Sequence, residues 1–116
     1  MSASPDFDPA QLADLASVLP TPVVRDLAAS FRSMVEALLA AVAETEGDAA
    51  GLREQAHDLK STAGSFGARH LQDMAEALEH ASARGEPVDL KPLLAQMHES
   101  ASAAFAALDV ALAELP

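Results

Sequence analysis

The sequence predicts an all-α protein, an up-down-up-down four-helix bundle with a short additional N-terminal helix. Three observations favour this fold class. Half of the 116 residues are hydrophobic, but there is no Trp or Tyr and only four Phe, a composition typical of closely packed helices. Apolar residues recur at spacings of three and four along four long segments. Pro and Gly residues separate these segments.

The N-terminal part of the chain predicts a short first helix. We expect residues 1–7 to be disordered and residues 8–116 to form a single domain with one core. Asp8 is the expected N-cap, and Pro9 the first helical residue. The helix should end before Pro20. Its apolar side is formed by Leu12, Leu15 and Val18.

A long second helix is predicted from Thr21-Pro22, which repeats the cap-then-proline pattern, to about Glu44. Its apolar stripe consists of Val24, Leu27, Phe31, Met34, Val35, Leu38 and Val42. The acidic stretch from Glu44 to Asp48 is an expected loop, and Asp48 can cap the third helix, which runs to about Ser65. The apolar stripe of the third helix consists of Leu52, Ala56, Leu59, Ala63 and Phe66.

Glycines punctuate the rest of the chain. Gly67 is expected to end the third helix as a structural turn in the left-handed conformation. The fourth helix runs from about Ala68 to Arg84 and is closed by Gly85, and Asp89 caps the last helix. The last two stripes consist of Leu71, Met74, Ala75 and Leu78, and of Leu94, Met97, Ala101, Ala104, Phe105, Leu108, Leu112 and Leu115. Three aromatic rings, those of Phe31, Phe66 and Phe105, should fill one core layer.

Charge and composition exclude several classes of function. The formal net charge is −11, which disfavours nucleic acid and anionic membrane surfaces as partners. No apolar run reaches the length of a membrane span, and the first residues do not resemble a secretory leader, so cytoplasmic residence is the expectation. The absence of cysteine excludes disulfides and thiol chemistry.

One face of the third helix carries the candidate site. His57, Lys60, Ser61 and Gly64 follow the i, i+3, i+4, i+7 spacing that places residues on one strip. Gly inside a helix costs about 1 kcal/mol relative to Ala. We therefore expect Gly64 to provide clearance for a partner approaching His57.

These residue types suit transfer of a phosphoryl group to histidine. A neutral imidazole nitrogen is a good nucleophile, and a lysine one turn away can offset the charge on the transferred oxygens. Arg53, at i−4 from His57, can also help to offset this negative charge. Little else is needed in this chain if the partner supplies the carboxylate and the metal.

Other site chemistries fit less well. No two histidines have the i, i+4 spacing of a helical metal pair, and the one Glu-x-x-His, Glu54 to His57, lacks a second half-site, so no metal site is expected. A small alanine-packed bundle offers little room for a hydrolytic pocket. The glycines do not form a nucleotide-binding loop, so use of ATP by this chain alone is not expected.

Residues 56–79 resemble the histidine-containing phosphotransfer (HPt) domains of phosphorelays. The motif that carries the resemblance is Ala56-His57-Asp58-Leu59-Lys60-Ser61, then Gly67-Ala68, Leu71 and Leu78-Glu79. It implies a phosphocarrier, not an ATP-dependent kinase, in which His57 takes a phosphoryl group from the aspartyl phosphate of one response-regulator receiver domain and passes it to another. The resemblance further implies that Lys60 assists, and that Mg²⁺ is held by the receiver domain. One departure is Ser61, where the family usually has Gly.

Related interpretations remain open. The box His57 to Ser61 also resembles the phosphoacceptor box of sensor histidine kinases, and Gly64 to Gly67 resembles the phosphoacceptor domain of chemotaxis kinases. A kinase hairpin dimerises, whereas a phosphotransfer bundle is expected to be a monomer. A module that binds receiver domains without transfer is a third possibility.

The partner surface is predicted from the same geometry. Receiver domains and a hybrid histidine kinase are the expected partners. The short first helix is expected across one end of the bundle near His57. Docking contacts are then expected from Leu12 and Leu15, together with Arg53, Ser61, Gly64 and Arg69.

Overall fold

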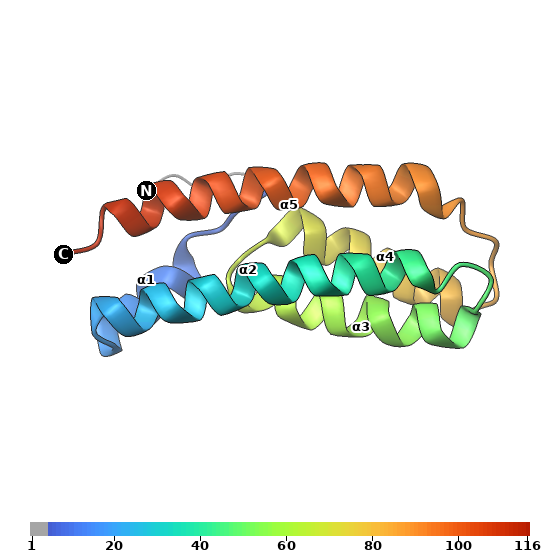
Figure 1. Ribbon diagram of the computed structural model, residues 1–116, viewed down its shortest axis with the longest axis horizontal. Helices are drawn as coiled ribbons and strands as arrows, with labels where there is room; N and C mark the ends of the chain where they lie inside the picture. The colour runs from blue at the N-terminus through green and yellow to red at the C-terminus, as the bar shows by residue number, and fades with distance from the viewer. Residues whose placement is uncertain (1–4) are drawn as a thin grey trace.

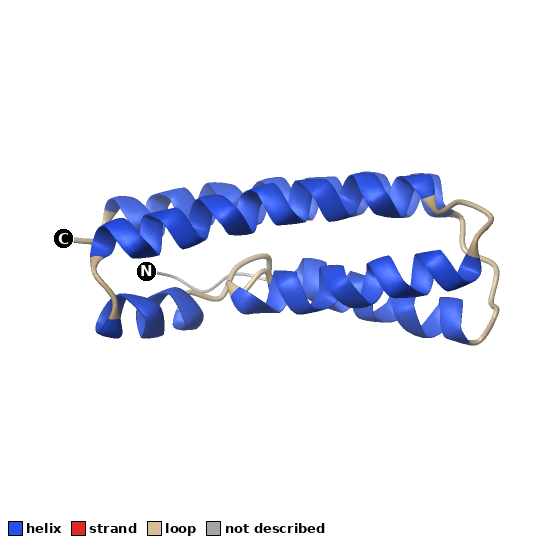
Figure 2. Ribbon diagram, turned by 60° about the horizontal axis from the view of Figure 1, so that its bottom comes forward, coloured by secondary structure: helices blue, strands red, loops and turns tan. Residues whose placement is uncertain are grey.

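The computed structural model describes residues 5–116, and all regular structure in that part of the chain is helical (Figure 2). The helices are α1 (Ala10–Val18), α2 (Thr21–Glu44), α3 (Ala49–Ser65), α4 (Arg69–Ala83) and α5 (Leu90–Ala113). The four long helices alternate in direction along a rod of 47 × 22 × 18 Å (Figure 1). The predicted all-α bundle is confirmed. No helix between residues 5 and 116 is long and apolar enough to cross a membrane.

The bundle has two long helices and a shorter hairpin. α2 and α5 each have 24 residues, whereas α3 has 17 and α4 has 15. α1 lies end to end with the α3–α4 hairpin and covers the part of the bundle that the hairpin leaves open (Figures 1 and 2). α1 is therefore part of the bundle. It continues the line of the hairpin past the turn that joins α3 to α4. His57 lies eight residues before the end of α3, about 12 Å by helical rise.

Aromatic rings form the expected layer where α1 and the hairpin meet. The rings of Phe31 and Phe66 stack with centroids 4.9 Å apart, and Phe105 meets Phe31 edge-on at 6.0 Å. This contact sets α2 beside the C-terminal half of α3. Around the rings the core is mainly Leu, Val and Ala, and seven side chains of Leu or Met are fully buried: Leu12, Leu39, Leu59, Leu71, Leu78, Met97 and Leu108.

Several of the predicted helix ends are confirmed. Asp48 is the N-cap of α3 and accepts a hydrogen bond from the Gly51 amide at 3.0 Å. Asp8 accepts one from the Ala10 amide at 3.0 Å, but Pro9, not Asp8, holds the N-cap position of α1. Gly67 has φ of +78°, the left-handed conformation that favours glycine. Thr21 is not the cap of α2, because the helix already begins at Thr21 and Pro20 holds the N-cap position.

The apolar stripe of α2 is narrower than predicted. Leu27 is 39% exposed and Met34 is 53% exposed, while Ala28 and Leu39 are buried in their place. The apolar residues on α2 cover more of its circumference than the neighbouring helices can bury. With Val23, which is 41% exposed, Leu27 and Met34 form what we call the apolar strip of α2.

The N-terminal segment is more ordered than predicted. Residues 1–4 of the expected disordered stretch 1–7 lie outside the described residues. Phe7, however, is only 2% exposed and belongs to the core. The Asp8 amide donates to the carbonyl of Gly67 at 2.7 Å. The segment is therefore fixed to the α3–α4 turn, because the Phe7 side chain is buried in the core and the backbone of Asp8 pairs with the turn.

Candidate functional site

His57 lies on the flank of α3 that borders α4. The apolar face of α3 is directed into the core, where Ala56 and Leu59 are fully buried. His57 is turned away from that face, and 58% of its side chain is exposed. The helix thus holds an accessible imidazole on a rigid, buried base.

Glu79 of α4 links the two principal residues of the predicted site. Its Oε2 lies 2.5 Å from Nδ1 of His57, and its Oε1 accepts a hydrogen bond from Nζ of Lys60 at 2.6 Å. The Glu79 side chain is only 13% exposed and that of Lys60 25%. One carboxylate therefore bridges a histidine and a lysine that lie one turn apart.

The charge of this carboxylate is maintained by its partners. The hydrogen bond from Lys60 lowers the pKa of Glu79 below its ordinary value of 4.5, and the contact with His57 adds to this effect, while desolvation opposes it. An ionised carboxylate can only accept hydrogen bonds. In a neutral imidazole the proton must then lie on Nδ1, which leaves the lone pair on Nε2.

Gly64 admits a side chain of the protein itself. A Cβ atom at this position would lie 2.6 Å from Nε2 of Gln72 and 3.1 Å from its Cδ. The carboxamide of Gln72, from α4, therefore covers the bare face of Gly64. The clearance that the sequence suggested for a partner is taken up, in this structure, by Gln72.

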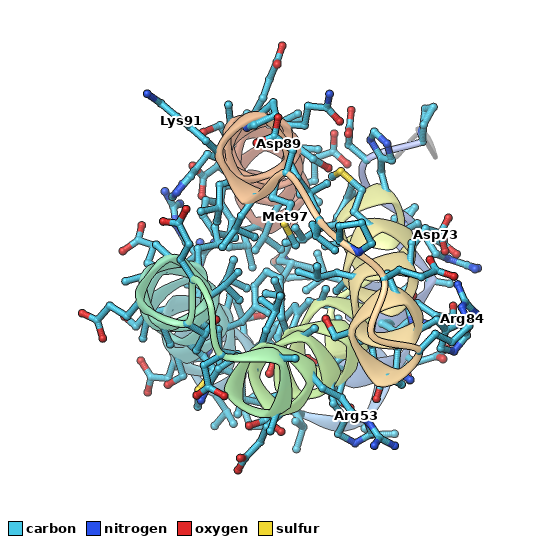
Figure 3. All side chains as sticks on the ribbon, turned by 90° about the vertical axis from the view of Figure 1, so that its right-hand side faces the viewer. Arg53, Asp73, Arg84, Asp89, Lys91 and Met97 are labelled. Atoms are coloured by element: carbon cyan, nitrogen blue, oxygen red, sulfur yellow. The ribbon has the colours of Figure 1, made fainter. Side chains whose placement is uncertain are left out.

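The remaining predicted contact residues fall into two groups. Arg53 and Ser61 are exposed on α3, and Arg53 projects from the bundle beside α4 (Figure 3). Arg69 instead pairs with Asp8 at 2.8 Å and helps to fix the N-terminal segment. That contact lowers the pKa of Asp8 through the hydrogen bond from Arg69.

The two leucines of α1 do not form the predicted docking surface. Leu12 is 0% exposed, because α1 turns its apolar face into the bundle, so this part of the prediction is wrong. Leu15 is partly buried and packs against the core. Val18 is the exposed residue of the three, at 76%.

Sequence reasoning missed the contacts that two residues of α4 make with the predicted site: Glu79 with His57 and Lys60, and Gln72 with Gly64. Glu79 was only the end of the motif Leu78-Glu79, and nothing in the sequence pairs it with His57 until the register of α3 against α4 is known. Between residues 5 and 116 no group of three or more His, Cys, Asp or Glu side chains is placed to hold a metal ion.

Comparison with known proteins identifies the family. The model of the Hpt domain matches residues 22–114, from the second residue of α2 to the end of α5, which include His57, Lys60 and Glu79. Neither the curated proteins nor the solved structures yield a match. Hpt domains perform histidine phosphotransfer in phosphorelays, where they interact with receiver domains and histidine kinases. With its helical bundle and the match over most of its length, the chain belongs to the Hpt domain family.

Proposed function

We propose that His57 is the phosphoacceptor, and that the protein relays a phosphoryl group from the aspartyl phosphate of one receiver domain to another. The observation that carries the proposal is the bridge from Glu79 to both His57 and Lys60. An accessible imidazole next to a carboxylate and an ammonium group supports transfer of a phosphoryl group to His57.

The geometry supports a specific transfer step. Nε2 of His57 attacks phosphorus with its lone pair, the bond from phosphorus to the aspartyl oxygen breaks, and the aspartate leaves as a carboxylate. The ring gains positive charge as the nitrogen–phosphorus bond forms. Glu79, which holds the Nδ1 proton, is placed to stabilise that charge. The reverse step returns the phosphoryl group to a second receiver domain.

Lys60 has the second role. Its ammonium group lies one turn from His57 and can approach the oxygens of the transferred phosphoryl group. Glu79 holds this ammonium group at 2.6 Å, so the cation is already in place before transfer. The Mg²⁺ that such transfers need would be supplied by the receiver domain.

The apolar strip of α2 is the docking surface that we assign to the receiver domain. Arg25 and Arg32 lie on the flank of α2 that meets α5, where Arg25 donates to the carbonyl of Leu112 and Arg32 pairs with Asp109. By helical periodicity, the strip of Val23, Leu27 and Met34 lies on the opposite flank. Phe31 stacks on Phe66 at the end of α3, so Met34 lies level with α3, whereas Val23 and Leu27 lie level with α1. Exposed apolar residues that share one flank of a helix are suited to bind a partner. This surface replaces Leu12, which is buried.

A transfer assay tests the proposal. A receiver domain labelled with ³²P on its aspartate is mixed, in Mg²⁺, with the wild-type protein or with the His57→Gln variant. We expect label on the wild type alone, labile in acid and stable in alkali, as a phosphohistidine should be. Label on His57→Gln, or no label on folded wild-type protein from any of several receivers, would contradict the proposal. Labelling only by an ATP-dependent kinase domain would favour a kinase phosphoacceptor domain instead.

A further inference from the structure

Gln72 of α4 presents an unused hydrogen-bonding group next to Gly64, on the α3 strip that carries His57. Its carboxamide lies on Gly64, with Nε2 2.6 Å and Oε1 3.5 Å from the position of a glycine Cβ. Gln72 is partly buried, and in the described chain its side chain makes no hydrogen bond. A carboxamide can donate two hydrogen bonds and accept two. Here the carboxamide lies over Gly64 and uses none of them within the described chain.

The position of Gln72 excludes a direct part in phosphoryl transfer. Gly64 lies seven residues after His57, about 10 Å along the helix axis. Side chains on a helix also lean toward its N-terminus, which takes the imidazole still farther from Gly64. Lys60, three residues away, is within reach of a phosphoryl group on Nε2, but the Gln72 amide is not.

We propose that Gln72 is a partner-binding residue, which pairs its carboxamide with a main-chain peptide group in a loop of the docked receiver domain. This inference rests on the proposed function. A carboxamide has the same donor and acceptor as a peptide group, so the two can exchange N–H···O=C bonds. On this proposal the receiver domain also contacts the α3–α4 hairpin, and Gly64 leaves room there for the Gln72 amide, which a larger residue would displace.

The proposed role of Gln72 is tested by measuring KM and kcat for transfer from a phosphorylated receiver domain. Gln72→Leu keeps the size of the side chain and removes both donor and acceptor. We expect the KM for the receiver to rise about tenfold, the effect of losing one neutral hydrogen bond, while the change in kcat stays within twofold. The equilibrium Kd of the unphosphorylated receiver should rise by the same factor. Gln96→Leu, an exposed position on α5, is the matched control and should change neither constant.

A double-mutant cycle separates the role of Gln72 from clearance at Gly64. Gly64→Ala should raise KM in the wild-type background, but by less than twofold once Gln72→Ala has removed the side chain that the glycine seats. An equal rise in both backgrounds would mean that the partner touches Gly64 itself, and would overturn the inference. An unchanged KM and Kd for Gln72→Leu, or an effect confined to kcat, would also overturn it.

The same experiments distinguish this inference from the function on which it rests. If wild-type protein accepts label normally and Gln72→Leu has the same KM, only the role of Gln72 is wrong. If folded wild-type protein neither binds nor accepts label from any receiver, both the relay function and the role of Gln72 are wrong. Thermal unfolding of each variant, monitored by circular dichroism, ensures that a rise in KM comes from folded protein.

Discussion

Nδ1 of His57 lies 2.5 Å from Oε2 of Glu79, a residue 22 positions later on the neighbouring helix. The contact joins the two helices of the hairpin at the point where the imidazole leaves the bundle surface. It fixes the orientation of the ring, and it determines that Nδ1 carries the proton in the neutral imidazole. The orientation of the His57 ring is therefore set by α4 as well as by α3.

Replacing Glu79 should slow transfer more than it weakens docking. Glu79→Gln keeps an acceptor for the Nδ1 proton but loses the charge that stabilises the ring as it becomes positive. We expect kcat to fall about tenfold, with KM for the receiver changed less than twofold. Rapid-quench transfer assays measure both constants. Glu76→Gln, an exposed position one turn earlier on α4, is the control, and an equal loss in both variants would contradict the role of Glu79.

Lys60→Met should also lower the rate of transfer. The substitution keeps the length of the side chain and removes the ammonium group that Glu79 holds near the phosphoryl site. Loss of a preorganised donor commonly costs 10²–10³ in rate, and Lys60 is partly exposed, so we expect a fall of about 10–100-fold in kcat. Lys91→Met, an exposed cation at the start of α5, should leave the rate unchanged. A kcat for Lys60→Met equal to that of the wild type would show that Lys60 does not contribute to transfer.

The sequence predicted the scaffold better than the site because helix ends and core faces are local signals. Asp48 and Gly67 correctly predicted the two ends of α3. Phe31, Phe66 and Phe105 were each predicted on the apolar stripe of a helix, and they form the buried layer. Contacts between helices depend on their register, which no local pattern encodes. Glu79 was therefore recognised only as part of a motif, although it is the residue that connects His57 to Lys60.

Two errors have the same physical origin. Leu27 and Met34 follow a helical spacing as regular as that of Phe31, but a helix with apolar residues on more than one flank does not show which flank will be buried. Phe7 is a single apolar residue before a helix and has no period at all. Its burial depends on the space at the end of the α3–α4 hairpin, which only the three-dimensional arrangement reveals.

Gly67→Ala should destabilise the fold. The residue has φ of +78°, and a Cβ atom there would overlap the carbonyl oxygen of Asp8. The left-handed conformation and the overlap together should lower the free energy of unfolding by about 2–4 kcal/mol. Urea denaturation measures the loss. Gly47→Ala, at φ of +82° with nothing near its Cβ position, should cost only about 1 kcal/mol; equal losses would show that the contact with Asp8 contributes nothing.

The N-terminal segment should contribute to stability through Phe7. Its ring is 2% exposed, and Phe7→Ala should lower the free energy of unfolding by about 3 kcal/mol, the ordinary cost of emptying a buried aromatic site. Val18→Ala, at a position 76% exposed, should change it by less than about 0.5 kcal/mol. Chemical denaturation measures the free energy of unfolding of both variants. A Phe7→Ala protein as stable as the wild type would show that burial of Phe7 does not stabilise the fold.

Stability should fall in acid partly through Glu79. Its pKa in the folded protein is lowered from 4.5, chiefly by the hydrogen bond from Lys60. The folded state then binds this proton less tightly than the unfolded chain does. The stabilisation is present above pH 4.5 and is lost as the pH falls through the lowered pKa. Urea midpoints measured from about pH 5 to pH 3 should decline less steeply for Glu79→Gln than for wild type; identical slopes would contradict the shift.

The position of the phosphoryl group on the imidazole tests the central claim most directly. ³¹P and ¹⁵N NMR of the protein labelled by a phosphorylated receiver distinguish the two ring nitrogens. Because Glu79 holds Nδ1, the group should be found on Nε2 of His57, while the contact from Nδ1 to Glu79 persists. A phosphoryl group on Nδ1, or on His70, His80 or His98 instead of His57, would contradict the account.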